Sequence, residues 1–301
     1  YKGNPQQRLL TVALVNRTGG HTGLDQHSLY QTMFEASVVA PDSDWHILPY
    51  PAASSIGMSD EVWDDEEASI ALLYRNTATY ATGHGCAADW RHDPVRDRAN
   101  RVFADPLPVF ETPSVTPNVV DSNGREIQVS MAALAGLVPS DDGFHTVEKV
   151  VSLYEEWIGV QEAQVSSLPP QHQAAARRHV ATCREAAVRM RSGLSYLRSN
   201  PLASKAFQLA NHAILTQQAR SRPEPRRTAF DEKAARFIFD EPYPEPDLLD
   251  LGTGRGNWRA FQIAFLLMTL EPAADGQSPD QETVELIWFP TGGGKTEAYL
   301  G

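Results

Sequence analysis

The sequence predicts an α/β chain with two parts: a helix-rich α+β domain over residues 1–240 and the beginning of a second, α/β domain over residues 241–301. Three observations support this prediction. Apolar residues recur at helical spacing through the middle of the chain, short apolar runs lead into glycine-rich turns near its end, and two proline-rich stretches, 220–227 and 241–246, separate these regions. The length of 301 residues fits two domains of roughly 150 residues each.

The first hundred residues predict short strands and one helix. Residues 9–15 are typical of a buried strand, residues 16–23 of a loop, and residues 46–51 of a second short strand that enters a turn. Acidic residues crowd positions 60–67, immediately before the apolar stretch 68–74. Because acidic side chains complement the dipole at the start of a helix, we interpret this cluster as a helix N-terminus rather than as a metal site.

Helices dominate the predicted middle of the chain. Two apolar stripes at helical spacing, one over 147–158 and a longer one over 180–197, each predict a helix, and Pro201 opens a third that runs to about residue 218. Cys183 lies on the second stripe, so we interpret it as a small core residue rather than as a nucleophile. The domain boundary is predicted near residue 240, between the two proline-rich stretches.

Charge is unevenly distributed along the chain. The net charge is −12, yet residues 171–227 contain eleven Lys and Arg against two acidic residues, which leaves −21 for the rest. A basic segment in an acidic protein can bind the phosphate backbone of a nucleic acid, or it can dock onto the protein's own acidic part. Composition does not decide between these two interpretations.

Several signals that would place a protein outside the cytoplasm are missing from the sequence. No stretch reaches the ~18 consecutive apolar residues of a membrane span, and no charged-then-apolar leader is visible. The two cysteines, Cys86 and Cys183, cannot make a disulfide scaffold. We therefore expect a cytoplasmic protein with no membrane contact.

A phosphate-binding loop is predicted at the end of the chain. The apolar run 284–289 predicts a buried strand, the sequence Pro-Thr-Gly-Gly-Gly-Lys-Thr follows at 290–296, and a helix is predicted from Lys295 onward. Glycines let backbone N–H groups converge on phosphate oxygens, and the helix N-terminus adds a favourable dipole. The predicted phosphate cradle, which would bind ATP, consists of Thr291, Gly292, Gly293, Gly294 and Lys295.

Two residues of this loop carry the predicted chemistry. Lys295 would reach the β- and γ-phosphates, and the Thr296 hydroxyl would ligate the Mg²⁺ ion that neutralises charge during phosphoryl transfer. The pattern departs from the strict G-x-x-x-x-G-K-[ST] form, because Phe289 stands where that form has its first glycine. The relaxed form P-T-G-G-G-K-T is the one that superfamily 2 helicases use.

Two other stretches combine residues that could carry chemistry. Residues 80–90 bring together His84, Cys86 and Asp89, but residues adjacent in sequence rarely form a catalytic constellation, and we interpret the stretch as a packed turn after a helix. Residues 248–257 look like the first motif of an S-adenosylmethionine-dependent methyltransferase, with Asp250 to Gly256 as its loop. A glycine-rich loop before a buried helix explains the same residues without a cofactor.

Three segments together carry a resemblance to a known family. These segments are Tyr-Ala-Thr-Gly-His-Gly-Cys-Ala-Ala-Asp-Trp at 80–90, Trp-Arg-Ala-Phe-Gln at 258–262, and the loop with its flanks at 288–301. They resemble the DrmA-like superfamily 2 helicases of bacterial DISARM anti-phage systems. The resemblance implies a first RecA-like P-loop ATPase domain that begins near residue 241, and it implies that Gln262, with Arg259, reads the adenine ring of ATP. A Gln amide suits adenine because it donates and accepts at once.

The resemblance also implies a source, a function and partners. It implies a prokaryotic, ATP-dependent DNA helicase or translocase in phage defence, which would act on phage DNA, single-stranded DNA included, together with a DrmB-like partner protein. Under the first alternative, residues 1–240 are a regulatory module that binds DNA or a partner without chemistry of their own. The second alternative is the methyltransferase.

The ends of the chain suggest a piece of a longer protein, since no initiator methionine is present and Gly301 falls inside the last predicted helix. We therefore expect residues 1–301 alone not to hydrolyse ATP at a meaningful rate.

Overall fold

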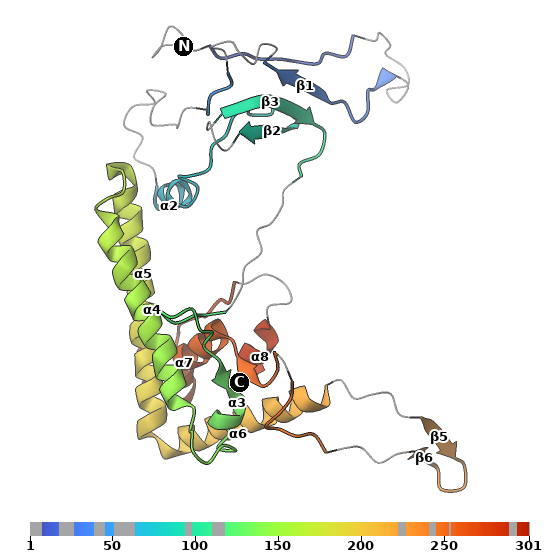
Figure 1. Cartoon of the computed structure of the whole chain (residues 1–301), viewed down its shortest axis with the longest axis vertical. Helices are drawn as coiled ribbons and strands as arrows, with labels where there is room; N and C mark the ends of the chain where they lie inside the picture. The colour runs from blue at the N-terminus through green and yellow to red at the C-terminus, as the bar shows by residue number, and fades with distance from the viewer. Residues whose placement is uncertain are drawn as a thin grey trace. The chain divides into compact units, whose positions relative to one another are not determined.

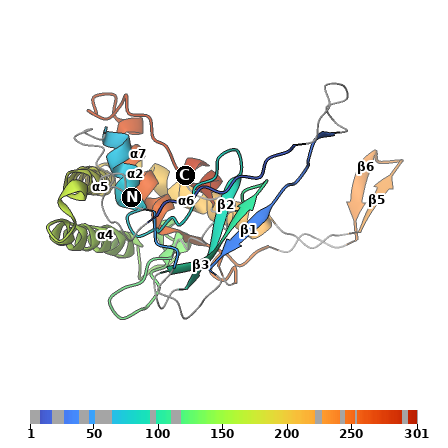
Figure 2. The ribbon, with the colours of Figure 1, turned by 90° about the horizontal axis from the view of Figure 1, so that it is seen from above.

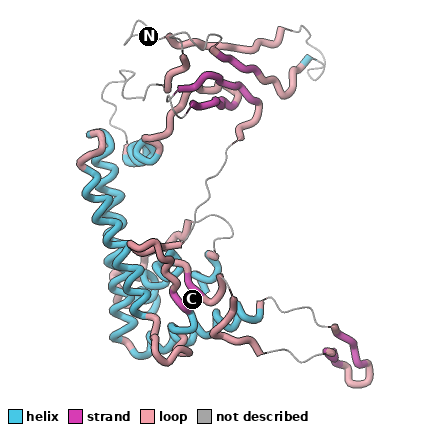
Figure 3. The backbone as a smooth tube through the Cα atoms, in the orientation of Figure 1, coloured by secondary structure: helices cyan, strands magenta, loops and turns pink. Residues whose placement is uncertain are grey.

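The computed structural model describes residues 8–17, 27–38, 46–50, 64–93, 98–109, 118–221, 227–240, 245–252, 254–288 and 294–300. The chain divides into two compact units, Tyr1–Pro113 and Ser114–Gly301 (Figure 1). Strands predominate in the first unit and helices in the second, as the secondary-structure colouring of Figure 3 makes visible. The predicted mixture of helices and sheets is therefore confirmed.

The first unit is built on a small antiparallel sheet. Its strands are β1 (Phe34–Ser37), β2 (Ala87–Asp93) and β3 (Arg98–Asp105), in the order β1-β3-β2. The register pairs Ala36 and Trp90 with the same central residue, Val102, so one face of the sheet is apolar. Tyr80 is buried against Trp90, with the two rings edge to face at 5.7 Å.

The one described helix of the first unit, α2 (Asp65–Leu73), confirms the interpretation of the acidic cluster. The carboxylate of Asp64 accepts the Glu67 N–H at 2.8 Å, and Asp65, Glu66 and Glu67 occupy the first turn. The strand predicted at 9–15 is wrong, because these residues have no ladder partner in the part of the chain that is described, and Leu10 is 81% exposed. Of the predicted strand at 46–51, one isolated bridge between Ile47 and Ala99 is formed.

The second unit consists mainly of long helices, with two short pairs of antiparallel strands. Helices α4 (Phe144–Val165) and α5 (Pro170–Ser199) lie side by side in both views (Figures 1 and 2). All three predicted central helices are confirmed. The remaining elements are α3 (Met131–Leu134), α6 (Pro201–Arg220), α7 (Ala260–Ala274), α8 (Lys295–Leu300), the pair β4 (Val129–Ser130) and β7 (Asn257–Trp258), and the hairpin β5 (Thr228–Asp231) and β6 (Arg236–Phe239).

The core of the second unit lies where α7 meets α4 and α5. Its largest fully buried side chains include Ile158, Leu197, Ile263 and Leu267. Helix α5 passes so close to α7 that a Cβ on Gly193 would stand 1.8 Å from the carbonyl oxygen of Leu267. Glycine is therefore needed at position 193, since any side chain would force the two helices apart.

A buried polar pair ties α6 to the start of α7. Asn211 is fully buried, and its amide donates to the Phe207 carbonyl at 2.8 Å while its oxygen accepts the indole N–H of Trp258 at 2.6 Å. Close by, the backbone N–H of Gly256 donates to the side chain of Gln218 at 3.0 Å. These contacts hold positions 218 and 256 together at the base of the segment that carries the β5–β6 hairpin.

The hairpin was not foreseen from the sequence. Phe230, Phe237 and Phe239 share one of its faces and are each about half exposed or more, with Phe230 and Phe237 edge to face at 5.3 Å. Most of the two predicted proline-rich linkers, 222–226 and 241–244, falls outside the described residues. The predicted boundary near residue 240 lies within the second unit, and a domain boundary of the whole protein at that position stays a prediction.

Across the described part of the chain, no helix combines the length and the apolar character needed to cross a membrane.

Candidate functional site

The predicted phosphate-binding residues lie at the junction between the glycine-rich loop and α8. Thr291, Gly292 and Gly293 fall outside the described residues, whereas Gly294, Lys295 and Thr296 are described. Helix α8 begins at Lys295, as predicted. The Lys295 residue is half-buried and Thr296 is exposed. A cationic side chain and an accessible hydroxyl therefore stand together in the first turn of a helix that follows a glycine.

Gln262 joins this junction to helix α7. Its side-chain amide donates to the carbonyl oxygen of Gly294 at 2.5 Å, a contact between residues 32 positions apart. Gly294 has φ +83°, and a Cβ there would approach the Gln262 amide nitrogen to 2.7 Å. Both the backbone conformation and the close approach require glycine at position 294. The two motifs that the sequence analysis paired by resemblance thus meet in space.

The amide of Gln262 also closes the first turn of α7. Its oxygen accepts the backbone N–H of Arg259 at 2.8 Å, which satisfies a donor that helix geometry leaves without an intrahelical partner. Gln262 is 3% exposed, whereas Arg259 is exposed. These two hydrogen bonds leave a second N–H and a second lone pair on the amide. The side chain is fixed in place while part of its hydrogen-bonding capacity remains.

Helix α8 packs against α7. Ala298 is 1% exposed, and the ring of Tyr299 meets that of Phe265 edge to face at 5.4 Å. Since α8 has six residues, and a helix of this length is marginal by itself in water, these contacts with α7 account for its order.

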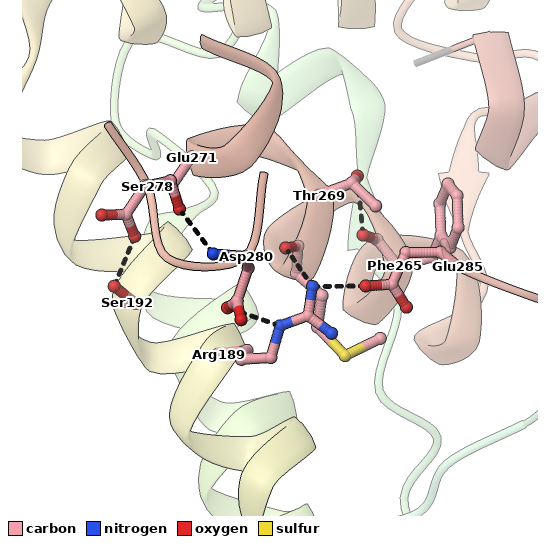
Figure 4. A network of polar contacts seen from close by, with 9 residues as sticks. Arg189, Ser192, Phe265, Thr269, Glu271, Ser278, Asp280 and Glu285 are labelled. Carbon is pink, nitrogen blue, oxygen red and sulfur yellow. Dashed lines mark hydrogen bonds and ion pairs between the residues drawn. The ribbon is translucent and has the colours of Figure 1, made fainter. Parts of the chain in front are cut away.

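An arginine of α5 holds the segment that leads into the loop (Figure 4). The Nε of Arg189 donates to Asp280 at 2.9 Å, and one terminal nitrogen donates to the Met268 carbonyl at 3.2 Å and forms an ion pair with Glu285. Sequence reasoning missed these residues, because the partners are separated by about ninety positions. A glycine within the α5 stripe, Gly193, was the available signal for a close approach on this face.

The strand predicted at 284–289 is wrong for residues 284–288, and Phe289 lies outside the described residues. The segment forms no ladder with any described strand, although its side chains alternate between strongly exposed and partly buried. Val284, Leu286 and Trp288 are 83–91% exposed, whereas Glu285 between them is held against α5. Apolar alternation is a necessary signal for a strand, but a strand also needs hydrogen-bonded neighbours.

Several cationic side chains of the basic segment 171–227 form ion pairs with carboxylates of the same protein. Nine of the segment's eleven cations are described, and five of these nine pair with carboxylates: Arg184 with Glu162, Arg189 with Asp280 and Glu285, Arg191 with Glu155 and Glu148, Arg198 with Glu148, and Arg220 with Glu245. Of the two interpretations left open by the sequence, docking onto the protein's own acidic residues accounts for these five.

The ion pair between α4 and α5 gives the second unit a pH dependence. Hydrogen bonds from Arg191, at 2.8 Å and 2.5 Å, hold the pKa of Glu155 below its ordinary value, since they favour the charged carboxylate. A carboxyl group whose pKa is lower in the folded protein than in the unfolded protein stabilises the fold at any pH above its unfolded-state pKa. This stabilisation is lost as the pH falls through the folded-state pKa. The loss therefore begins below the ordinary glutamate value of 4.5.

We expect Arg191→Met to lower the free energy of unfolding at pH 7 by about 0.2–1 kcal/mol, the size of a largely exposed ion pair. The difference in the free energy of unfolding between this variant and the unmutated protein should shrink between pH 5 and pH 3, because protonated Glu155 has no negative charge to attract the Arg191 guanidinium. Denaturant unfolding at several pH values measures this. A gap that stays constant with pH would mean that Arg191 acts through packing alone.

The methyltransferase-like stretch does not have the local structure that such a motif needs. Residues 245–252 contain neither a strand nor a helix, and Leu249 is 64% exposed where a buried strand was required. The Arg255 guanidinium bonds to the carbonyl of Gln218, and Gly256 bonds to the same residue's side chain. These contacts explain the stretch as a loop packed on α6, which is the cofactor-free interpretation.

The stretch at 80–90 leads into β2 through a tight turn. A Cβ on Gly83 would overlap the Cys86 carbonyl, which supports the interpretation as a packed turn. No group of three or more metal-ligating residues forms among the side chains that are described, those of His84, Cys86 and Asp89 included.

Comparison with known proteins adds one relative. Over 251 residues, or 80% of this chain, the sequence is 30% identical to "DISARM protein DrmA" of Bacillus paralicheniformis. The chain is similar to a DISARM protein. It spans about a fifth of the length of that relative, so the match concerns one part of a longer protein. No protein-family model matches the chain. The superfamily 2 helicase resemblance and the RecA-like domain implied by it stay predictions.

Proposed function

We propose that this chain is the nucleotide-binding entry portion of an ATP-dependent DNA helicase or translocase that acts in phage defence. The observation that carries the proposal is the hydrogen bond from Gln262 to the carbonyl of Gly294, because it joins the predicted adenine motif to the predicted phosphate loop. The similarity to a DISARM protein supports the role in defence. The RecA-like character of residues from 241 onward is part of the proposal.

The residues present fit a magnesium–nucleotide complex. Gly294 has the positive φ that glycine adopts without strain, a backbone conformation found where successive N–H groups converge on a phosphate. Lys295 would bind the β- and γ-phosphates, and the exposed Thr296 hydroxyl would serve as a ligand of Mg²⁺. ATP supplies the γ-phosphoryl group when bound. The contribution of these residues is to bind and orient it and to neutralise charge.

Adenine selection would fall to Arg259 and Gln262. Gln262 is buried and fixed by two hydrogen bonds, which lowers the entropic cost of using its remaining N–H and lone pair on a base. Arg259 is exposed at the same helix start and could cover the ring face. The same geometry also allows a simpler role, in which Gln262 positions the loop without touching the base.

Replacing Gln262 tests the proposal and separates these roles. We expect Gln262→Ala in the full-length protein to weaken Mg-ATP binding roughly tenfold, since two hydrogen bonds to the loop and the helix start are lost. A fluorescent ATP analogue measures the affinity, and the same titration with the GTP analogue shows whether adenine preference falls too. Loss for both nucleotides alike identifies a positioning role, and loss for ATP alone identifies base selection.

Gln277→Ala serves as the matched control, because Gln277 lies exposed in the turn after α7. It should leave both affinities unchanged. Unaltered nucleotide binding by Gln262→Ala would contradict the proposal, because the hydrogen bond between Gln262 and Gly294 would then have no part in the nucleotide site.

DNA and a DrmB-like protein are the proposed partners. For DNA, the arginines that already pair with carboxylates are poor candidates for phosphate contacts, because an incoming phosphate would have to displace each carboxylate. The described cations outside these ion pairs are better candidates, among them Arg177, Lys205 and Arg227. Affinity that falls steeply with salt, and that charge reversal of these three residues removes, would support a DNA contact on this unit.

A further inference from the structure

The glycine-rich loop is flanked on both sides by residues that are held from neighbouring helices. After the loop, Gln262 of α7 holds the carbonyl of Gly294. Before the loop, Glu285 is held by an ion pair with Arg189 of α5, and Asp280 by a hydrogen bond to the same guanidinium at 2.9 Å. Figure 4 shows the guanidinium between these two carboxylates. The entrance and the exit of the loop are therefore attached to the same helical core.

Arg189 is well suited to this attachment. Its side chain is 21% exposed and that of Glu285 is 20% exposed, so the pair is screened less by solvent than the exposed ion pairs between α4 and α5. The planar guanidinium makes three contacts at once: hydrogen bonds to the Asp280 carboxylate and the Met268 carbonyl, and an ion pair with Glu285. A lysine ammonium at this position could not reproduce that planar arrangement.

We propose that Arg189 is a positioning residue for the nucleotide site, which sets where the polypeptide enters the glycine-rich loop. This inference rests on the proposed function, because the nucleotide is what the loop would meet. It also assigns a role to α5. A displacement of α5 relative to α7 would be passed to the loop entrance through one side chain, so the long helices and the nucleotide site are mechanically linked.

The test uses the full-length protein with Arg189→Met, Arg189→Lys and Glu285→Gln. Two measurements are made: hydrogen exchange of residues 281–288 and 294–300 without nucleotide, and the affinity for a fluorescent Mg-ATP analogue. We expect Arg189→Met to speed exchange in both segments and to weaken binding by roughly tenfold, with Arg189→Lys intermediate. The double variant Arg189→Met with Glu285→Gln should be no weaker than Arg189→Met alone, because both changes remove one interaction.

Arg191→Met is the matched control. Arg191 lies two positions along the same helix and pairs with Glu155 of α4 rather than with the loop segment. It should leave both readouts unchanged. Unchanged exchange in Arg189→Met, or an equal rise in Arg191→Met, would overturn the proposal. If the unmutated protein binds no nucleotide while Arg189→Met alone speeds exchange at 281–300, the proposed function fails and the attachment by Arg189 stands.

Discussion

Lys295→Ala in the full-length protein is expected to reduce DNA-stimulated ATP hydrolysis by about 10²–10³-fold, the usual cost of removing one group that stabilises developing charge in a transition state. The side chain stands in the first turn of α8, directly after Gly294. If it binds the β- and γ-phosphates, its loss should lower both the affinity for Mg-ATP and the turnover at saturation. The same variant should lose protection against phage in cells.

Phosphate release measured beside the unmutated protein checks this result. Lys233→Ala is the control, because Lys233 lies exposed in the turn between β5 and β6 and belongs to neither the proposed nucleotide site nor the proposed DNA contacts. Its turnover should match that of the unmutated protein. Undiminished, DNA-stimulated turnover by Lys295→Ala would rule out the nucleotide site proposed here.

The second large effect is expected at the crossing of α5 and α7. Gly193→Ala should destabilise the second unit by at least about 1–3 kcal/mol, the usual cost of overpacking, because the new Cβ would stand 1.8 Å from the Leu267 carbonyl oxygen. The helices cannot relax freely, since Arg189 and Ser192 hold α7 and the segment after it from the same face of α5. Thermal unfolding measures the loss.

Gly159→Ala provides a control of the same chemistry. Gly159 lies in the interior of α4, and a Cβ there would have no neighbour within 4 Å. Replacement of an unconstrained helical glycine by alanine should stabilise the protein by about 0.5–1 kcal/mol. Opposite signs for the two substitutions would confirm that packing, and not helix propensity, requires glycine at 193. A loss of equal size at both positions would contradict it.

The helices of the second unit could be predicted from sequence because their signals are local. An apolar stripe identified α5, and Pro201 identified the start of α6, where the structure adds a cap from the Asn200 oxygen to the Leu202 and Ala203 N–H groups. The acids before α2 were interpreted correctly for the same reason. Periodicity and capping are decided within a few residues of the chain.

The strands and the polar contacts could not be predicted because they depend on distant residues. Residues 9–15 and 284–288 have the composition of strands, yet neither pairs with another described segment. The contacts of Arg189 with Asp280 and Glu285 join parts of the chain that nothing in either local sequence connects. For the site, the glycine-rich pattern predicted Gly294 and the resemblance predicted Gln262, whereas the direct hydrogen bond between them is known from the structure alone.

The bond between Gln218 and Gly256 has a consequence for how this region can change during evolution. It brings the two ends of a 38-position span into contact, and Asn211 with Trp258 reinforces the closure from inside the core. A span whose ends already meet can be lengthened or shortened at little cost to the rest of the fold, because the entropy of loop closure grows slowly with length. The β5–β6 hairpin therefore lies in a segment that can be exchanged without disturbing the core. We expect the length and sequence of this segment to vary among relatives, while the pairs Gln218–Gly256 and Asn211–Trp258 are kept.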